Sequence, residues 1–498
     1  MRTTFSIKNS AMQFITNITS IILTFVGRIL FIKILGVEYS GLNGLFTNIL
    51  TILNLFELGI SSSITFNLYK YVKNDDKDTI KSIMYFYKKA YNYIAILILF
   101  VGLLITPLIK YTIKDISIDI NIYLIFILFL LSTVSSYILS YKRNLIIANQ
   151  KNYIINLVEI VFILILNVLQ IIVLFLTKNF YLYLVIKILC VLLENFVINH
   201  ISSKLYPFLL DKNIKPLNDD IKENIVSRIK TLIIHKTSGA VTNGTDNILI
   251  SSFLGIVTAG LFTSYNYIVT SVKRLFSNVI SAVTPSIGNL LVENNCDKNY
   301  MIYKRIVLFN FWIAVFTSTS LLLITQPFIK IWLGKDYLLD ITVLISIVAN
   351  YYQTMMRSTY NSFKEAAGIW IEDKYVPLAQ LSINLISSII LLKTIGLPGV
   401  FIGTIISSFV VWFYSYPILV YKKLFNRRVI NYYKEIFLYL LLFILIISLS
   451  FVINLFLSNI FFSIMISLIV PNFLLYIFFK NTDEFKYYFN LIKRNINR

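Results

Sequence analysis

The chain has 498 residues, of which 57% are hydrophobic and only 14% are charged. A soluble globular protein carries about 25% charged residues, so this composition excludes an ordinary soluble domain and indicates a protein whose solvent is the lipid bilayer. The formal net charge of +21 invites a nucleic-acid-binding interpretation, which the placement of the basic residues argues against below.

Long apolar runs follow one another along the whole chain, separated by short polar stretches. A helix that crosses about 30 Å of hydrocarbon needs about 20 mostly apolar residues, and the runs predict an all-α polytopic protein of about fourteen transmembrane helices. The first six runs are residues 10–35, 42–69, 84–109, 120–141, 153–176 and 180–201. The next six are residues 229–254, 259–288, 305–327, 341–362, 375–395 and 398–420, and a final pair follows at 434–457 and 459–479.

Most of the 45 lysines and arginines fall in alternate loops and tails, beginning with the N-terminal tail. This bias is the positive-inside rule, which predicts that both termini are cytoplasmic. The basic excess is therefore a feature of topology, and no nucleic-acid partner is expected. Two cysteines and two histidines offer no disulfide framework and no metal site. Asp76 and Asp78 form an Asp-x-Asp pair of the kind that holds a metal in glycosyltransferases, but their short lysine-rich loop favours a solvated turn.

The two halves of the chain resemble each other. Gly36 and Gly41 in the first half correspond to Gly255 and Gly260 in the second, an offset of 219 residues. Each half spans an even number of helices, so the repeats run parallel, as in one of the standard transporter architectures. We therefore expect two pseudo-symmetric six-helix lobes and a C-terminal pair, with domains at 1–210, 211–424 and 425–498.

Ionisable residues inside predicted membrane helices are the most informative positions, because each is costly unless it faces protein or water. Several of them lie in polar stripes at helical spacing, such as His235, Ser238, Thr242 and Asp246 in the run 229–254. A single serine or threonine in a stripe is better explained by helix packing, whereas the charged members favour a cavity shared by two lobes. These members are Arg28, Glu57, Glu159, Asp246, Lys273 and Arg357.

Opposite charges fall on adjacent predicted helices in both halves. Arg28 and Glu57 lie on the first two helices, and Asp246 and Lys273 lie on the corresponding pair of the second half. Buried partners of opposite sign lower each other's cost. We therefore expect an Arg28–Glu57 pair and an Asp246–Lys273 pair.

Arg357 is the cation expected to be freest for an anionic ligand. It shares a helical face with Asn350 and Gln353, and its helix carries no acidic residue within the predicted span. An arginine presents a bidentate fork to phosphate groups. The alternative is that Arg357 pairs with Glu159 across the lobes as a gate.

Several segments carry a family resemblance. They are Tyr39-Ser40-Gly41-Leu42-Asn43-Gly44-Leu45-Phe46, Glu57-Leu58-Gly59-Ile60, Thr245-Asp246-Asn247-Ile248-Leu249-Ile250-Ser251, Phe363-Lys364-Glu365-Ala366-Ala367-Gly368, Glu372-Asp373-Lys374-Tyr375 and Gly396-Leu397-Pro398-Gly399. Together they resemble the bacterial polysaccharide and O-antigen flippases of the multidrug/oligosaccharidyl-lipid/polysaccharide exporter superfamily. The resemblance covers the twelve-helix core.

The resemblance implies a transporter of the bacterial cytoplasmic (inner) membrane. Such a protein moves undecaprenyl-diphosphate-linked oligosaccharide from the cytoplasmic to the outer leaflet by alternating access, for O-antigen, capsule or exopolysaccharide synthesis. It is not an enzyme and needs no cofactor. Its transport could be coupled to a gradient of Na⁺ or of H⁺, and the resemblance leaves this choice open. The implied partners are the lipid-linked oligosaccharide and membrane lipids, with other polysaccharide-assembly proteins as further candidates.

On this interpretation the polar stripes supply two groups of site residues. The substrate-binding residues are Arg28, Lys273, Arg357, Asn350 and Gln353, and the cavity or coupling residues are Glu57, Asp246 and Glu159. Cavities in this family tend to be cationic, which suits a diphosphate. The six stripe charges in this chain sum to zero, so the sequence departs in part from that pattern.

Two other functions compete with this one. An exporter of small cationic drugs shares the fold and uses acidic residues to bind the cation or proton, and the family-like segments argue against it. A membrane-embedded glycosyltransferase or polysaccharide polymerase needs acidic groups or arginines in a sizeable external loop. The external loops predicted here are short, and a duplicated core has no obvious use in such an enzyme.

Overall fold

The computed structural model describes residues 2–496 apart from 58–59, 212, 294, 370–371 and 458. Side chains are further left out at residues 2–7, 10, 56, 62, 228, 230–243, 285, 292, 492 and 494–496. The expected stripe members His235, Ser238 and Thr242 thus lie outside the described side chains, and Leu58 and Gly59 lie outside the described residues. Every element of the described chain is helical, which confirms the all-α fold class.

The chain divides into two compact units, Met1–Gly260 and Leu261–Arg498. Unit 1 contains α1 (Arg2–Leu35), α2 (Val37–Leu53), α3 (Ile60–Lys73), α4 (Lys77–Ile105), α5 (Ile122–Tyr137), α6 (Arg143–Ala148), α7 (Asn152–Thr177), α8 (Phe180–Leu205), α9 (Asp219–Leu254) and the start of α10 (Ile256–Ser281). Tighter 3₁₀ segments lie at Asn54–Phe56, Thr106–Thr112, Ser140–Lys142 and Pro207–Leu210.

Unit 2 contains the rest of α10 and the helices that follow it. These are α11 (Thr284–Val292), α12 (Cys296–Trp332), α13 (Ile341–Ala366), α14 (Val376–Ile395), α15 (Leu397–Val410), α16 (Lys423–Phe425), α17 (Val429–Phe456), α18 (Ile460–Phe479) and α19 (Asp483–Ile496), with a 3₁₀ turn at Lys335–Tyr337 and a π-helical segment at Val411–Lys422. The predicted domains are sequence repeats of six spans, whereas the two units are defined by their internal contacts. The boundaries of the predicted domains therefore stay a prediction.

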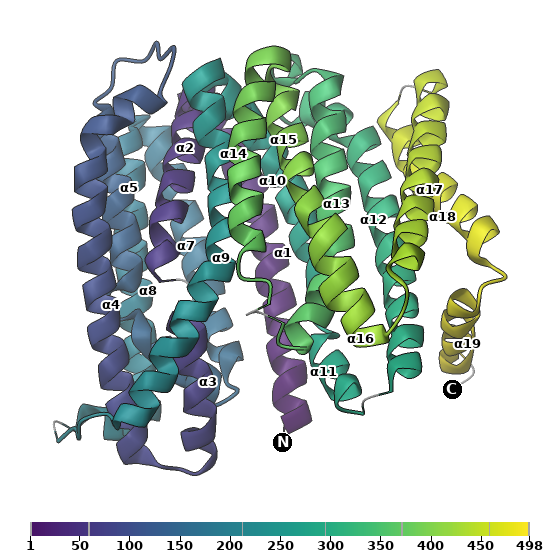
Figure 1. The fold of residues 1–498 in the computed structure, drawn as a ribbon. Helices are drawn as coiled ribbons and strands as arrows, with labels where there is room; N and C mark the ends of the chain where they lie inside the picture. The colour runs from purple at the N-terminus through teal and green to yellow at the C-terminus, as the bar shows by residue number, and fades with distance from the viewer. Residues whose placement is uncertain are drawn as a thin grey trace. The chain divides into compact units, whose positions relative to one another are not determined.

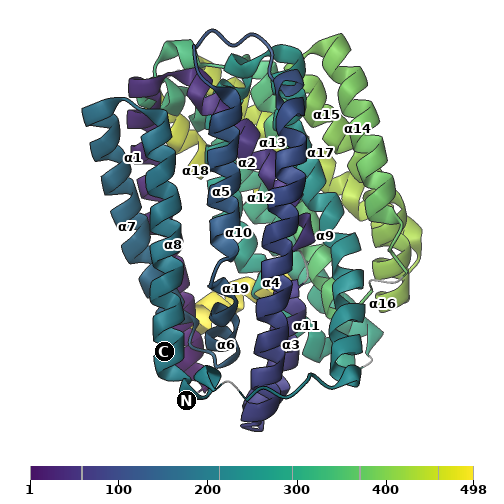
Figure 2. The ribbon, with the colours of Figure 1, turned by 90° about the vertical axis from the view of Figure 1, so that its left-hand side faces the viewer.

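Each unit is a layer of helices that pack side by side. In unit 1, α1 packs on α7, α7 on α8, α8 on α5 and α5 on α4, and α9 lies against α2 and α3; Figure 2 shows the row of α7, α8, α5 and α4 from its outer face. In unit 2, α12 contacts α13, α17 and α18, and α14 packs along α15 (Figure 1).

Several predicted spans are interrupted in the structure. The run 42–69, expected as one helix, is broken between α2 and α3 by a 3₁₀ turn at Asn54–Phe56. The run 259–288 divides into α10 and α11, where Pro285 stands in the first turn of the second helix, because proline cannot continue a preceding helix. α5 ends at Tyr137, and Leu139 takes a left-handed backbone conformation with φ of 62° before α6 begins.

Nine helices of the described chain are long and apolar enough to cross a membrane, and the bent segment α5–α6 makes a tenth if it counts as one span. Fourteen spans therefore stay a prediction. The broken α2–α3 segment and the helices α10 and α13, which carry polar stripes, are not among the ten. They are the helices that need a polar interior beside them.

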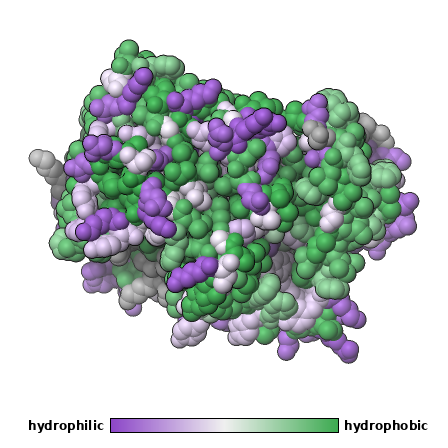
Figure 3. Space-filling view, turned by 90° about the horizontal axis from the view of Figure 1, so that it is seen from above, coloured by the Kyte–Doolittle hydropathy of each residue, from purple (hydrophilic) through white to green (hydrophobic). Residues whose placement is uncertain are grey.

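The outer surfaces of many helices are apolar. On α17, for example, Phe437 is 61% exposed and Phe456 is 83% exposed. Seen from above, the end face presents hydrophilic and hydrophobic side chains side by side (Figure 3). Such apolar exposure is unfavourable in water and ordinary in lipid, so the chain is a multi-pass membrane protein.

Equivalent segments of the two sequence repeats, at the starts of α2 and α10, contact each other within unit 1. A Cβ placed on Gly41 would lie 2.2 Å from the carbonyl oxygen of Ile256, and a Cβ on Gly260 would lie 2.3 Å from that of Val37. Val37 and Ile256 are themselves equivalent positions, so the two contacts are reciprocal. Gly36 and Gly255, which begin the two helices, both have positive φ, 99° and 92°, which only glycine adopts at little cost.

Alternate loops of unit 1 lie at the same end. At one end, Asn9 bonds to the main chain of Gln150 and Tyr153, and Lys151 lies 5.8 Å from the centre of the Tyr206 ring. At the opposite end, Glu38 accepts from the backbone N–H of Ser117 at 3.1 Å. The N-terminal tail and the loops near residues 150 and 206 therefore lie at one end, and the loops near residues 36 and 117 lie at the other, as the positive-inside pattern requires.

The C-terminal helices are attached to the rest of unit 2 by specific contacts. Glu435 of α17 accepts hydrogen bonds from Tyr300 and Tyr421 at 2.5 and 3.2 Å. Trp312 of α12 donates to Asn472 of α18 at 2.6 Å, and α19 adds an ion pair of Glu484 with Lys304. These helices are thus an integral part of the unit.

The glycine crossing makes a prediction about stability. Gly41→Ala and Gly260→Ala each place a methyl group against a backbone carbonyl. Unlike the end of a flexible side chain, this carbonyl cannot rotate out of the way. We expect each change to destabilise the protein by about 1–3 kcal/mol, as overpacking does, and to lower the thermal unfolding midpoint of the purified protein in detergent.

Gly288→Ala on α11 is the matched control, because a Cβ there has no described atom within 4 Å. Alanine is the better helix former, so this variant should unfold at the wild-type temperature or slightly above it. Equal midpoints for Gly41→Ala and Gly288→Ala would show that the crossing is not close-packed.

Candidate functional site

The break between α2 and α3 places Glu57, Asn54 and Ser61 in a partly buried polar cluster of unit 1. Glu57 accepts a hydrogen bond from the Tyr91 hydroxyl at 2.7 Å, and Asn54 accepts one from Tyr137 at 3.0 Å. Ser61 accepts from the side-chain amide of Asn144 at 2.8 Å. Ending the α-helix at Leu53 frees backbone and side-chain groups that a continuous helix would have kept apart, and α4, α5 and α6 supply their partners.

Arg28 occupies a different part of unit 1 from Glu57. Its guanidinium donates to the hydroxyl of Ser40, which in turn donates to the carbonyl of Gly260 at 3.3 Å. The expected Arg28–Glu57 pair does not form. Glu57 follows Ser40 by 17 residues, and a helix rise of 1.5 Å per residue puts the two about 25 Å apart, so a side chain beside Ser40 cannot reach it.

Glu159 is paired, and its partner is a residue that the sequence analysis did not single out. Arg143, the first residue of α6, lies 3.1 Å from the Glu159 carboxylate and 2.5 Å from that of Glu194. It also donates to the side-chain oxygen of Asn195 at 3.0 Å. Arg143 falls just after a predicted span, where a basic residue is ordinary, so only the bend of α5–α6 reveals its role.

Asp246 on α9 has no cationic partner in the part of unit 1 whose side chains the structure describes. Its Oδ1 atom is buried without a hydrogen bond. A charged carboxylate buried in this way is costly, so a proton or a metal cation is a natural occupant. Lys273 belongs to unit 2, so the expected Asp246–Lys273 pair stays a prediction.

Arg357 on α13 is held by uncharged groups. Its Nε donates to the Tyr416 hydroxyl at 3.2 Å and its NH2 group to the side-chain oxygen of Gln380 at 3.4 Å. Tyr416 donates onward to Asn361 at 2.8 Å and stacks on Tyr360 with ring centres 4.8 Å apart. The Arg357–Glu159 gate would join the two units and stays a prediction.

Two further cations lie near Arg357 in unit 2. Lys273 on α10 and Lys364 on α13 are both close enough to Arg357 for their charges to repel it. Lys364 forms an ion pair with Asp373, whose side chain is only 1% exposed and which closes the turn between α13 and α14. In the described residues neither Lys273 nor Arg357 has a carboxylate within 4.0 Å.

The other predicted binding residues of α13 lie one and two turns before Arg357. Gln353 donates to Asn350 at 2.8 Å, and its own side-chain oxygen is buried without a hydrogen bond. Thr354 donates to the Asn350 carbonyl at 2.8 Å. The structure therefore keeps Asn350, Gln353 and Arg357 on neighbouring turns of one helix.

The fold of this chain is similar to those of three solved membrane proteins. The lipid II flippase MurJ in an inward closed conformation superposes with a TM-score of 0.66 and 14% identity, over 95% of this chain and 99% of MurJ. An inward-facing MATE family multidrug transporter of the MOP superfamily gives 0.62 and 15%, over 79% and 91%. A mutant of the MATE transporter VcmN from Vibrio cholerae gives 0.58 and 13%, over 85% and 99%.

The family itself is shown at the level of sequence. The model of the family described as polysaccharide biosynthesis protein matches residues 6–291, which is more than half of the chain. The chain belongs to this family. The comparison with curated proteins finds no match.

The cluster around Glu57 makes a prediction about transport. Glu57→Gln keeps an oxygen that can accept from Tyr91 and removes only the negative charge. We expect export by cells that depend on this protein to fall about tenfold or more, the effect of about 1.4 kcal/mol, with unchanged amounts of protein in the membrane.

Tyr91→Phe is the matched control, because it removes the hydrogen bond and keeps the charge. It should lower thermal stability by about 1 kcal/mol and leave most of the export. Normal export by Glu57→Gln would remove this residue from the working machinery.

Proposed function

We propose that this protein is a flippase that moves undecaprenyl-diphosphate-linked oligosaccharide from the cytoplasmic to the outer leaflet of the bacterial inner membrane, and that it is not an enzyme. Membership of the polysaccharide biosynthesis family and the MurJ-like fold support the class of protein. The glycan would serve O-antigen, capsule or exopolysaccharide synthesis. Membrane lipids and other polysaccharide-assembly proteins are its proposed partners.

One observation carries the choice of an anionic substrate. In unit 2, Lys273 and Arg357 lie near enough for their charges to repel each other, and no carboxylate in the described part of that unit lies within 4.0 Å of either. Two like charges inside a membrane protein are costly unless something of opposite sign binds between or beside them. A diphosphate supplies that charge and several acceptor oxygens, to which an arginine donates as a fork.

The carboxylates of unit 1 suggest how such transport could be driven. Among the described residues, neither Glu57 nor Asp246 has a lysine or arginine within 4.0 Å. We propose that these carboxylates take up H⁺ or Na⁺ during an alternating-access cycle, while the cations of unit 2 bind the substrate. Glu159 is engaged by Arg143, so we assign it a part in holding α6 and α7 together.

The drug-exporter alternative draws on the same acidic residues. Their presence in unit 1 and the MATE-like fold are compatible with binding of an organic cation. The unpaired cations of unit 2 favour the anionic substrate instead, since they would repel a cationic drug.

The proposal predicts how Arg357 variants bind the substrate. Arg357→Ala should weaken binding of a purified undecaprenyl-diphosphate-linked glycan about tenfold or more, because a hydrogen bond to a charged group contributes about 1.5–3 kcal/mol. Arg357→Lys should recover only part of this affinity, since lysine lacks the fork. Binding can be measured by native mass spectrometry of the protein in detergent.

Gln380→Leu is the control for local disturbance, because it removes a partner of Arg357 and leaves the cation in place. Unchanged affinity in Arg357→Ala would remove Arg357 from the binding site. Weak binding that Glu159→Gln restores would instead assign Arg357 to a gate.

The proposed orientation makes its own prediction. In a chain without native cysteines (Cys190→Ser and Cys296→Ser), Lys114→Cys and Lys335→Cys should react in intact cells with an impermeant maleimide. Lys215→Cys should react only after the cells are permeabilised, because the positive-inside rule places it in the cytoplasm. The opposite pattern would reverse the topology and the direction of transport inferred from it.

A further inference from the structure

A cavity of about 330 Å³ opens beside α4 in unit 1, apart from the polar clusters described above. Its wall contains three lysines, two tyrosines and one aspartate. The lining residues used below are Lys81, Tyr85, Lys88, Tyr141, Lys142 and Asp211. A water molecule takes about 30 Å³ of liquid volume, so the cavity has room for a phosphate or diphosphate group.

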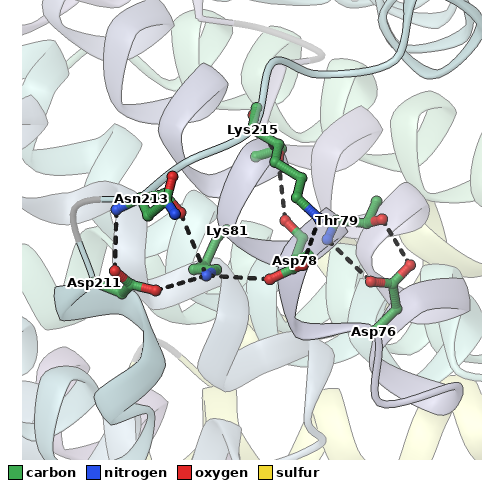
Figure 4. Close-up of polar contacts among 8 residues, drawn as sticks. Asp76, Asp78, Thr79, Lys81, Asp211, Asn213 and Lys215 are labelled. Carbon is green, nitrogen blue, oxygen red and sulfur yellow. Dashed lines mark hydrogen bonds and ion pairs between the residues drawn. The ribbon is translucent and has the colours of Figure 1, made fainter.

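The aspartate in the wall is already neutralised. Lys81 lies 2.9 Å from the carboxylate of Asp211 and 3.2 Å from that of Asp78 (Figure 4). Hydrogen bonds from the backbone N–H of Asn213 and from Lys81 hold the pKa of the Asp211 carboxyl below its ordinary value, so it is ionised at neutral pH. The carboxylate of Asp211 is therefore paired with Lys81, and it is not available to neutralise Lys88 or Lys142.

Lys88 and Lys142 carry the excess positive charge. No carboxylate of the described residues lies within 4.0 Å of either ammonium, and the two charges are near enough to repel each other. Lys142 is only 6% exposed and donates to the Ser203 hydroxyl at 2.6 Å. An ammonium has three donors, so this single neutral acceptor leaves a buried cation with capacity for an anion.

The cavity is closed on one side by the segment that joins the two sequence halves. Lys215 forms an ion pair with Asp78 at 3.1 Å, and its carbonyl accepts from Ser82 at 2.8 Å. These contacts, with the Lys81–Asp211 pair, hold Asp211 and Lys215 against the start of α4 (Figure 4). Leucines 209 and 210 add an apolar rim, which suits the chain of a lipid better than a free solute.

We propose that this pocket binds the phosphate group of a lipid at the lysine-rich end of unit 1. Basic pockets between membrane helices bind lipid head groups in this way, and the hydroxyls of Tyr85 and Tyr141 are further donors for phosphate oxygens. The lipid is either an anionic phospholipid or the polyprenyl diphosphate carrier. Because Asp211 and Ile214 form part of the wall, a bound lipid would fasten the connection between the halves to α4.

The test measures lipid retention by the purified full-length protein in detergent, by native mass spectrometry. The probes are phosphatidylglycerol, undecaprenyl diphosphate and inorganic phosphate, with diacylglycerol as the uncharged control. Lys88→Gln and Lys142→Met should each weaken binding of the phosphate-bearing lipids about tenfold, the effect of losing a charge-assisted contact. Lys73→Gln is the matched control, because this exposed lysine at the end of α3 does not line the cavity, and the affinity of this variant should equal that of the wild type.

Each outcome decides a point. Loss of both lipids in Lys88→Gln supports a general lipid site, and loss of undecaprenyl diphosphate alone supports a carrier site. The measurement is repeated in Arg357→Ala protein, so that binding in this pocket is distinguished from binding at the proposed transport site. Equal lipid affinity in wild type, Lys88→Gln and Lys142→Met, or equal retention of diacylglycerol, would overturn the proposal. Lys88 is exposed, so its variant remains informative if Lys142→Met fails to fold.

Discussion

The close approach of two backbone segments at Gly41 and Gly260 is the constraint on which unit 1 depends. The first turn of α2 and the first turn of α10 meet with no room for a side chain at either glycine. Because each glycine faces the carbonyl of the other segment, the contact is the same when the two repeats are exchanged. Ser40 lies at this crossing and accepts from Arg28, so the geometry of one crossing also fixes the position of a buried cation.

Interruptions of helices place the remaining polar groups. The break after Leu53 brings Glu57 to Tyr91, and the bend after Tyr137 brings Arg143 to Glu159 and Glu194. Helix breaks are tolerated inside a membrane only where neighbouring groups satisfy the freed polar atoms. The same interruptions thus determine where the polar interior lies. Discontinuous helices form substrate and ion sites in many transporters in the same way.

The two units differ in the charges they leave unpaired. Among the side chains that the structure describes, unit 1 contains carboxylates without a cation within 4.0 Å, at Glu57 and Asp246, and unit 2 contains Lys273 and Arg357, whose charges repel each other. The zero sum of the six stripe charges concealed this difference, because three carboxylates and one cation belong to unit 1 and the other two cations belong to unit 2. The proposed division between cation coupling and anion binding rests on this difference.

Much of the fold was predictable from hydrophobic runs and from the glycine repeat. Each expected span has helices at the corresponding residues, and Gly36 and Gly255 were matched by offset before their backbone conformations were known.

The partners of these residues were not predictable. Helical spacing tells which residues share a face, but the contact across to another helix depends on depth and on how the helices cross. Arg28 was therefore assigned to Glu57, although it lies a whole helix away beside Ser40. Tyr91, Arg143 and Lys142 gave no signal, because a tyrosine or a basic residue near the end of a membrane span is ordinary.

The central claim is that the protein moves a polyprenyl-diphosphate glycan across the bilayer. The direct measurement reconstitutes the purified protein into liposomes with a fluorescent undecaprenyl-diphosphate-linked oligosaccharide and follows the glycan that an impermeant periodate reagent can oxidise. The account predicts that wild-type protein makes nearly all of the glycan accessible, whereas Arg357→Ala protein leaves the inner-leaflet half protected. If wild-type protein leaves the glycan protected while it transports cationic dyes in the same liposomes, the anionic substrate is contradicted.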